Sequence, residues 1–273
     1  MNRLALMFLK NLYRLPWGYW KLCRYAKHTE KYPEPEKWNH IRKVLKWAVD
    51  AGNIDLQVHG QENLPQENGF MLYGNHQGQF DVLAIATTCA PPLAIVYKKE
   101  LKNVPILKQI LTCTNSFAMD REDVRQSLTV IQNVIKEVQS GRNYVIFPEG
   151  TRSKQGNVMG EFHGGRFRCA VKAKCPVIPM AFIDCFKVLD EKGSKPITAQ
   201  IHYLKPIPYE EYKDMKAAEL AELVKARIQA CIDANTGTEK PMGKRPSAFC
   251  CYRVSALSKM ALAADSLDCR GRA

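Results

Sequence analysis

The sequence predicts an α/β fold with a mostly parallel central sheet flanked by helices. From residue 54 onward, short apolar runs of strand length alternate with longer segments of helical period. This alternation is typical of a parallel sheet, because crossover helices join parallel strands. The predicted strands are 55–59, 70–73, 94–97, 116–119, 144–147, 177–182 and 199–204, and the predicted helices between and after them are 80–89, 104–111, 124–139, 166–173 and 215–234.

The helix predicted over residues 124–139 has the clearest amphipathic pattern. Its apolar residues recur at spacings of three and four, which places them on one face of a helix. We interpret this stripe as part of the core, with no role in binding a cofactor. Its members are Val124, Leu128, Ile131, Val134, Ile135 and Val138.

Changes in composition divide the chain into three predicted parts. Residues 1–50 are expected to form a basic amphipathic helical hairpin, with a helix over 38–50 and a turn over 28–37, where Pro33 and Pro35 lie. Residues 51–235 hold the α/β domain. Residues 236–273 are polar and contain Gly and Pro, so we expect a linker and tail there.

The formal net charge is +13, and much of it lies near the start of the chain. Residues 1–48 contain eleven Lys and Arg against three Glu, and they hold all four tryptophans. Tryptophan beside Lys and Arg is typical of the boundary between lipid headgroups and acyl chains. A nucleic-acid-binding arm would also be basic, but it would not need the apolar run over residues 4–9. We therefore expect an anionic membrane surface as the partner, while packing of these helices on the α/β domain stays a compatible alternative.

The predicted mode of membrane attachment is peripheral or monotopic, on the cytoplasmic face. No stretch reaches the roughly 18 apolar residues of a spanning helix, and the run over 4–9 is too short for the core of a secretory signal. The ten cysteines show no paired spacing for zinc. Reduced thiols in the cytosol are the expectation that follows.

The first of two polar segments, residues 74–81, follows the apolar run 69–73. Its His76 and Asp81 would point about 140° apart on one regular helix. They can pair if His76 lies in the loop after the strand and Asp81 in the first turn of the next helix, with Gly78 at the bend. A carboxylate on one ring nitrogen leaves the other free to accept a proton from an alcohol. This spacing alone is also compatible with a structural histidine.

The second polar segment, residues 147–153, follows the apolar run 143–146. Gly150 permits a tight turn, and Arg152 is suited to a bidentate contact with a phosphate. Glu149 would orient Arg152 or accept a substrate hydroxyl. Because the carboxyl ends of parallel strands share one edge of a sheet, we expect the two segments to meet there.

Together these motifs resemble those of the glycerolipid acyltransferase family, and most closely those of the 1-acyl-sn-glycerol-3-phosphate (lysophosphatidic acid) acyltransferases. The resemblance covers roughly residues 55–205. It rests on Asn75-His76-(x4)-Asp81 and on residues 147–153 about seventy positions later. Two further blocks agree in order and spacing, residues 99–121 and 162–179.

The resemblance implies transfer of a fatty acyl chain from a thioester of coenzyme A or acyl carrier protein to the sn-2 hydroxyl of 1-acyl-sn-glycerol-3-phosphate, giving phosphatidic acid. His76 would be the base and Asp81 its orienting carboxylate. Direct attack by the substrate hydroxyl is simpler than a protein nucleophile, and no metal or redox cofactor is implied. The residues expected to bind the acceptor are Lys99, Arg121, Glu149, Gly150, Thr151 and Arg152.

Three positions depart from the family pattern and leave alternatives open. Asn115 stands where a glycine is expected, His163 where a lysine is usual, and Arg166 where a small residue is common. Glycerol-3-phosphate or another lysolipid is therefore an alternative acceptor. A membrane-bound lipid-binding protein without activity is an alternative of another class, and His76, Asp81, Glu149 and Arg152 argue against it.

Overall fold

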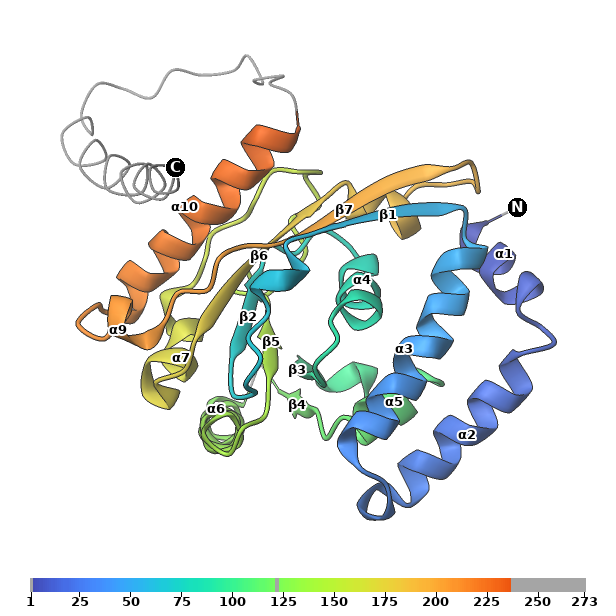
Figure 1. Cartoon of the computed structure of the whole chain (residues 1–273), viewed down its shortest axis with the longest axis horizontal. Helices are drawn as coiled ribbons and strands as arrows, with labels where there is room; N and C mark the ends of the chain where they lie inside the picture. The colour runs from blue at the N-terminus through green and yellow to red at the C-terminus, as the bar shows by residue number, and fades with distance from the viewer. Residues whose placement is uncertain (1, 121–122, 237–273) are drawn as a thin grey trace, which may run out of the picture. The chain divides into compact units, whose positions relative to one another are not determined.

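A seven-stranded sheet forms the centre of the computed structural model, which describes residues 2–120 and 123–236 (Figure 1). The strands lie in the order β1-β7-β6-β2-β5-β3-β4. All seven predicted strands are present, with their ends shifted by two residues or less. Their bounds are β1 Ile54–His59, β2 Met71–Gly74, β3 Ala94–Lys98, β4 Phe117–Met119, β5 Tyr144–Ile146, β6 Val177–Ile183 and β7 Ile197–Tyr203.

The sheet is mostly parallel, as predicted. Strand β2 pairs in parallel with β5 on one side and β6 on the other, and β3 pairs in parallel with β5 and β4. Only the pairing of β6 with β7 is antiparallel, and β1 follows β7 in parallel. The loops that leave β2, β3 and β5 therefore lie along the same edge of the sheet.

Helices cover both faces of the sheet and create two apolar cores. One core lies under α3, α4 and α8, and the other under α6, α7 and α10. The helix bounds after β1 are α4 Phe80–Thr88, α5 Leu107–Cys113, α6 Val124–Gln139, α7 Arg168–Ala173, α8 Cys185–Asp190, α9 Tyr209–Tyr212 and α10 Ala217–Asn235, with short 3₁₀ turns η2 Gln61–Asn63, η3 Lys99–Asn103 and η4 Gly164–Phe167. Helices α8 and α9 are the two among these that lie outside the helices predicted from the sequence.

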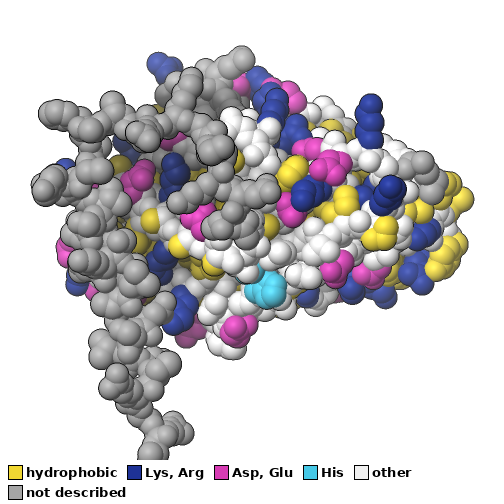
Figure 2. All heavy atoms as spheres, turned by 90° about the horizontal axis from the view of Figure 1, so that it is seen from above, with side chains coloured by type: hydrophobic (Ala, Val, Ile, Leu, Met, Phe, Trp, Pro, Cys, Tyr) yellow, Lys and Arg dark blue, Asp and Glu magenta, His cyan; other side chains and the backbone are white. Residues whose placement is uncertain are grey.

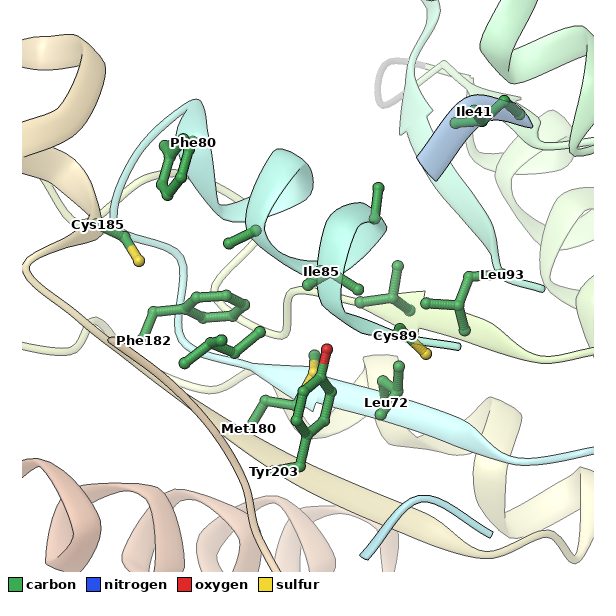
Figure 3. Close-up of a cluster of buried hydrophobic side chains, with 14 of the residues drawn as sticks. Ile41, Leu72, Phe80, Ile85, Cys89, Leu93, Met180, Phe182, Cys185 and Tyr203 are labelled. Atoms are coloured by element: carbon green, nitrogen blue, oxygen red, sulfur yellow. The ribbon is translucent and has the colours of Figure 1, made fainter. Parts of the chain in front are cut away.

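Helix α4 is fixed on the sheet by a cluster of fully buried side chains (Figure 3). Phe80 and Ile85 of α4 pack with Leu72 of β2 and with Met180 and Phe182 of β6. The strand residues supply continuous apolar surface because β2 and β6 are buried on both faces. This packing holds the first turn of α4 at the carboxyl end of β2.

Three helices, rather than two, precede the sheet: α1 Arg3–Lys10, α2 Leu15–Lys27 and α3 Glu34–Ala51, with the 3₁₀ turn η1 Thr29–Lys31 between the last two. The predicted turn over 28–37 is wrong for residues 34–37. Pro35 lies in the first turn of α3, where its missing N–H group has no intrahelical partner to lose. Leu22 of α2 and Trp38 of α3 are buried in the core beside α4, so these helices pack on the domain.

The predicted core stripe of α6 is confirmed in part. Val134 and Val138 are buried, but Leu128 is 52% exposed. The side chain of Val124 and the predicted tail after Thr236 lie outside the described residues.

Most described cysteines are small buried residues, as predicted. Cys89, Cys113, Cys169, Cys175 and Cys185 are buried and unpaired. Burial raises the pKa of the Cys113 and Cys169 thiols to about 11, so both stay protonated near neutral pH.

An exposed apolar and aromatic surface covers α1 and α2. Figure 2 shows hydrophobic side chains among Lys and Arg at the end of the molecule where Figure 1 has these helices. Within the described residues, no helix combines the length and the apolar character needed to cross a bilayer. The large exposed side chains of this surface are Leu4, Phe8, Leu9, Leu12, Tyr13, Trp17, Tyr19 and Trp20.

Candidate active site

His76 and Asp81 form a hydrogen-bonded pair at the carboxyl end of β2. His76 lies in the loop after the strand and Asp81 in the first turn of α4, with 2.7 Å between His76 Nδ1 and Asp81 Oδ2. The same Oδ2 accepts the backbone N–H groups of Gln77 at 2.7 Å and Gly78 at 3.0 Å. An oxygen that accepts three donors fixes the tautomer, so Nδ1 carries the ring proton and Nε2 is the free acceptor.

Asp81 is fully buried, whereas the His76 side chain is 20% exposed. Burial raises the pKa of the Asp81 carboxyl, while the hydrogen bonds from His76, Gly78 and Gln77 act in the opposite direction. The Oδ1 atom of Asp81 has no hydrogen-bond partner. The carboxylate is therefore held by one oxygen.

A glycine is needed at position 78 because the backbone passes too close to α8 to leave room for a side chain, and not because of its backbone angles. A Cβ atom at this position would lie 3.0 Å from the Cα of Phe186 and 3.2 Å from Oδ2 of Asp190. The loop that carries His76 thus passes directly against α8.

The two polar segments meet, as the sequence predicted. Glu149, in the loop after β5, accepts the backbone N–H of His76 at 2.8 Å through Oε1. Ser153 of the same loop donates its N–H to the carbonyl of His76 at 2.9 Å. The ring of Phe147 stacks on the imidazole with 4.2 Å between centroids. Backbone and ring of His76 are therefore both held by the segment that begins at Phe147.

Glu149 has a different role from the one predicted. Its second oxygen accepts the N–H of Gly160 at 3.0 Å, so both oxygens bind backbone donors and the predicted orientation of Arg152 by Glu149 is wrong. Glu149 is buried, and burial raises the pKa of its carboxyl against the effect of the His76 and Gly160 N–H groups. The carboxylate joins the His76 loop to the segment that precedes η4.

Two buried amides beside His76 were not predicted as site residues. Asn75 exchanges two hydrogen bonds with the backbone of Phe182, donating to its carbonyl at 3.0 Å and accepting its N–H at 2.8 Å. Gln77 accepts the N–H of Cys185 at 2.9 Å and donates to Asn157 at 2.8 Å. Both amides fix the loop on β6 and α8. The signal available in the sequence was their position on either side of His76.

Arg152 lies on the side of the loop that faces α8. Its Nη1 atom is 3.4 Å from Oδ1 of Asp190, and both side chains are about one third exposed. Because Asp190 also approaches Gly78, Arg152 is near the His76 loop. Thr151, by contrast, is exposed to solvent.

Gly150 adopts a positive φ of 73°, as expected for a tight turn. A Cβ atom there would lie 2.3 Å from Nη2 of Arg166, so the guanidinium group of Arg166 lies directly over this glycine. The backbone of Arg166 is held by Tyr73, whose hydroxyl donates a hydrogen bond to the Arg166 carbonyl at 3.1 Å. His163, the other unusual residue of this block, is exposed.

Of the remaining predicted acceptor-binding residues, the structure describes Lys99, which lies further along the same edge of the sheet. Lys99 follows β3 and forms an ion pair with Asp120 at 2.5 Å, at the end of β4. Strand β3 is two positions from β2, on the far side of β5. Arg121 lies outside the described residues. Asn115 has a φ of 46°, which fits the left-handed conformation expected where the family has glycine.

Comparison with known proteins agrees with this fold. Residues 55–183 match the family model described as Acyltransferase, and they include His76, Asp81, Glu149, Arg152 and Arg166. The chain carries an acyltransferase-family domain.

Several curated proteins that resemble this chain bear a common name. A 1-acyl-sn-glycerol-3-phosphate acyltransferase of Borreliella burgdorferi is 29% identical over 140 residues, which are 51% of this chain and 56% of that protein. A protein of the same name from Saccharomyces cerevisiae is 26% identical over 224 residues, 81% of this chain and 69% of that protein. The chain thus spans just over half the length of the first relative and about two thirds of the second.

A solved structure supports the fold of this chain. It is the crystal structure of the 1-acyl-sn-glycerophosphate acyltransferase from Thermotoga maritima, with a TM-score of 0.72 and 21% sequence identity. The likeness covers 87% of this chain and 98% of that one.

Proposed function

We propose that this protein transfers a fatty acyl chain from a thioester to the sn-2 hydroxyl of 1-acyl-sn-glycerol-3-phosphate, giving phosphatidic acid. The observation that carries the proposal is the His76–Asp81 pair, with 2.7 Å between Nδ1 and Oδ2, clamped by Glu149 in an acyltransferase-family domain. The names of the curated relatives support this acceptor. The donor is an acyl thioester of coenzyme A or acyl carrier protein.

The reaction needs one proton acceptor that later becomes a donor. Nε2 of His76 takes the proton of the sn-2 hydroxyl while its oxygen attacks the thioester carbonyl carbon. The tetrahedral intermediate then collapses, the carbon–sulfur bond breaks, and Nε2 returns the proton to the departing sulfur. Asp81 stabilises the imidazolium between these steps through its 2.7 Å hydrogen bond. These reaction steps require no metal, no redox cofactor and no protein nucleophile.

The phosphate of the acceptor would be bound by the cations that surround the His76 loop. Arg152 is the nearest candidate because its partner Asp190 approaches Gly78 in that loop. A 3.4 Å pair between two partly exposed side chains is weak, so a phosphate dianion can displace Asp190 from Arg152. Lys99 would assist from the end of β3, and Arg121 is a further candidate from the sequence.

The exposed surface of α1 and α2 would hold the enzyme on anionic lipid, where the acceptor and product reside. Trp17 and Trp20 are about half exposed, and Lys21, Lys43 and Arg24 lie over their rings. Exposed tryptophans flanked by cations suit the headgroup region of a bilayer. The proposed location is therefore the membrane surface on the cytoplasmic side.

An acyl-transfer assay tests the proposal. The purified protein would receive 1-acyl-sn-glycerol-3-phosphate, glycerol-3-phosphate or a lysolipid without a phosphomonoester, each with acyl-CoA or acyl carrier protein thioester. We expect preferential acylation of the first acceptor, and none by the His76→Ala variant. Transfer to glycerol-3-phosphate alone would replace the proposed acceptor, and transfer to none of the three would overturn the function.

A further inference from the structure

The loop that joins β3 to α5, residues 98–106, has an unusual surface. Every residue in it is exposed, although it contains three large aliphatic side chains. Leu101, Val104 and Ile106 are 40%, 42% and 43% exposed. Single exposed aliphatic residues are common on soluble proteins, but three within six positions form a patch. We call these nine residues the β3–α5 loop.

The backbone of this loop is strained at its most prominent apolar residue. Ile106 has a φ of 69° and a ψ of −52°, and the N–H of Leu107 donates to the carbonyl of Pro105 at 2.8 Å. These values describe a γ-turn of the rare, strained form. A β-branched side chain is disfavoured at positive φ, so the sequence retains an isoleucine where Gly or Asn would fit better. The strain indicates that the position is used for something other than stability.

The β3–α5 loop lies along the same edge of the sheet as the catalytic pair. Strand β3 runs parallel to β5, and β5 runs parallel to β2, so the loops after these strands emerge on the same side. His76 follows β2 and Lys98 ends β3, two strands away. A lipid held at this loop is therefore on the side of the molecule from which His76 is reached.

Helix α5, which follows the β3–α5 loop, lies against α2. The side chain of Gln109 in α5 donates to the hydroxyl of Tyr19 in α2 at 3.3 Å. A cleft of about 240 Å³ lies between the two helices, and Lys27 of α2 and Lys108 of α5 line it together with Cys23, Ala26, Gln109 and Thr112. Tyr19 belongs to the exposed aromatic surface described above, so α5, which follows the loop, contacts that surface, and the neighbouring cleft carries two cations.

The charge around the loop matches an anionic lipid surface. Lys98, Lys99, Lys102 and Lys108 are all exposed, and Glu100 is the one acidic residue among positions 98–108. Aliphatic tips surrounded by lysines suit a bilayer whose headgroups are negative, because the tips enter the acyl region while the ammonium groups remain among phosphates.

We propose that the β3–α5 loop is a second membrane-contacting element, which inserts Leu101, Val104 and Ile106 into an anionic bilayer beside the surface of α1 and α2. The inference deepens the proposed function and rests on it in one respect: the loop brings the membrane to the side of the sheet where the lysolipid acceptor must reach His76. The cleft between α2 and α5 accommodates a lipid phosphate between Lys27 and Lys108.

Vesicle binding tests the loop without any turnover. The full chain and the variant Leu101→Ser/Val104→Ser/Ile106→Asn would be sedimented with vesicles of phosphatidylcholine and phosphatidylglycerol. Asn tolerates the left-handed region better than Ile, so this exchange removes apolar area without adding backbone strain. We expect the variant to bind about tenfold more weakly. Leu128→Ser on α6, where Leu128 is 52% exposed, is the matched control and should bind like the parent chain.

A kinetic comparison tests the link to the proposed function. Acylation of a long-chain acceptor embedded in vesicles would be measured against that of a short-chain acceptor dissolved below its micelle concentration. The triple variant should lower the ratio of the two rates about tenfold, through the KM for the embedded acceptor. A parent chain that acylates neither acceptor contradicts the proposed function, but it leaves the vesicle-binding result to decide the role of the loop.

Two results would overturn the inference. One is parental vesicle affinity for a triple variant whose circular dichroism and thermal midpoint match those of the parent. The other is an unchanged vesicle affinity combined with a change in oligomeric state, which would assign the patch to a second copy of the chain. If the triple variant is poorly folded, Ile106→Gly decides instead, because it removes the side chain at a position where Gly is preferred. Parental binding by that folded single variant would equally contradict the proposal.

Discussion

His76 Nδ1 lies 2.7 Å from Asp81 Oδ2, although the two residues are separated by a loop and a helix start. The contact is possible because Asp81 Oδ2 simultaneously accepts the N–H groups of Gln77 and Gly78. One buried oxygen thus shapes the loop and orients the imidazole. Loop geometry and ring tautomer depend on the same charge.

Asp81→Asn should therefore reduce turnover by about 10²–10⁴-fold. The amide can offer its oxygen to the backbone donors, but it no longer carries the charge that stabilises the imidazolium. The measurement is kcat with saturating donor and acceptor. Urea unfolding of the variant and the parent chain serves as the control, because a variant that is unfolded would lose activity for reasons unrelated to the His76–Asp81 pair. A variant with parental kcat would contradict the assignment of His76 as the base.

Arg152→Ala and Asp190→Asn should affect acceptor binding in opposite directions. Loss of the guanidinium removes a charge-assisted contact of about 1.5–3 kcal/mol, so the acceptor KM should rise by roughly 10- to 150-fold. Asp190 competes for Arg152 at 3.4 Å, and neutralising it should lower the same KM by about two- to fivefold. Donor KM is the internal control. An acceptor KM that stays constant in both variants would remove Arg152 from the phosphate site.

Much of the fold followed from patterns that are local in the sequence. Seven apolar runs became seven strands, and the spacing of His76 and Asp81 correctly implied a loop followed by a helical turn. The role of Glu149 could not be predicted, because its partners are the backbone N–H groups of His76 and Gly160. Every residue other than proline has a backbone N–H group, so the residue types do not reveal which of these groups a side chain binds. Leu128 was assigned to the core from periodicity alone, which does not tell how far a neighbouring element extends.

The position of Arg166 shows the same limit. The sequence revealed an unusual residue, but only the coordinates show its guanidinium over Gly150. The helix start at Glu34 was missed for a different reason. Pro33 and Pro35 predict a turn, whereas the second of them is compatible with the first turn of a helix.

Gly150→Ala should destabilise the domain and disturb the loop that holds His76. An alanine at a φ of 73° costs about 1–2 kcal/mol, and its Cβ would lie 2.3 Å from Nη2 of Arg166. Adding Arg166→Ala relieves the clash with the guanidinium group but not the backbone strain. Thermal unfolding of the two single variants and the double variant measures the cost of the clash and of the strain. Equal stability of Gly150→Ala and the double variant would mean that the arginine moves aside at no cost.

Stability should fall as the pH is lowered from about 7 toward 4, in part through His202. This side chain is buried, stacks on His59 with 4.4 Å between ring centroids, and bonds Gln200 through Nε2. Burial, followed by the nearby charge of His59, lowers the pKa of His202 from 6.5 to about 4.

The sign follows from comparing the folded and unfolded chains. Below pH 6.5 the unfolded chain binds a proton at position 202 that the folded chain rejects until about pH 4, so protonation favours unfolding across this interval. Because the ring keeps some contact with solvent, we expect the free energy of unfolding to fall by about 2 kcal/mol rather than by the full value of the pKa shift.

His202→Phe keeps an aromatic ring on His59 and cannot be protonated. Urea unfolding at pH 7 and pH 4.5 should show a smaller difference in the free energy of unfolding for this variant than for the parent chain. An identical difference in both proteins would show that other groups, such as His40, govern the acid sensitivity.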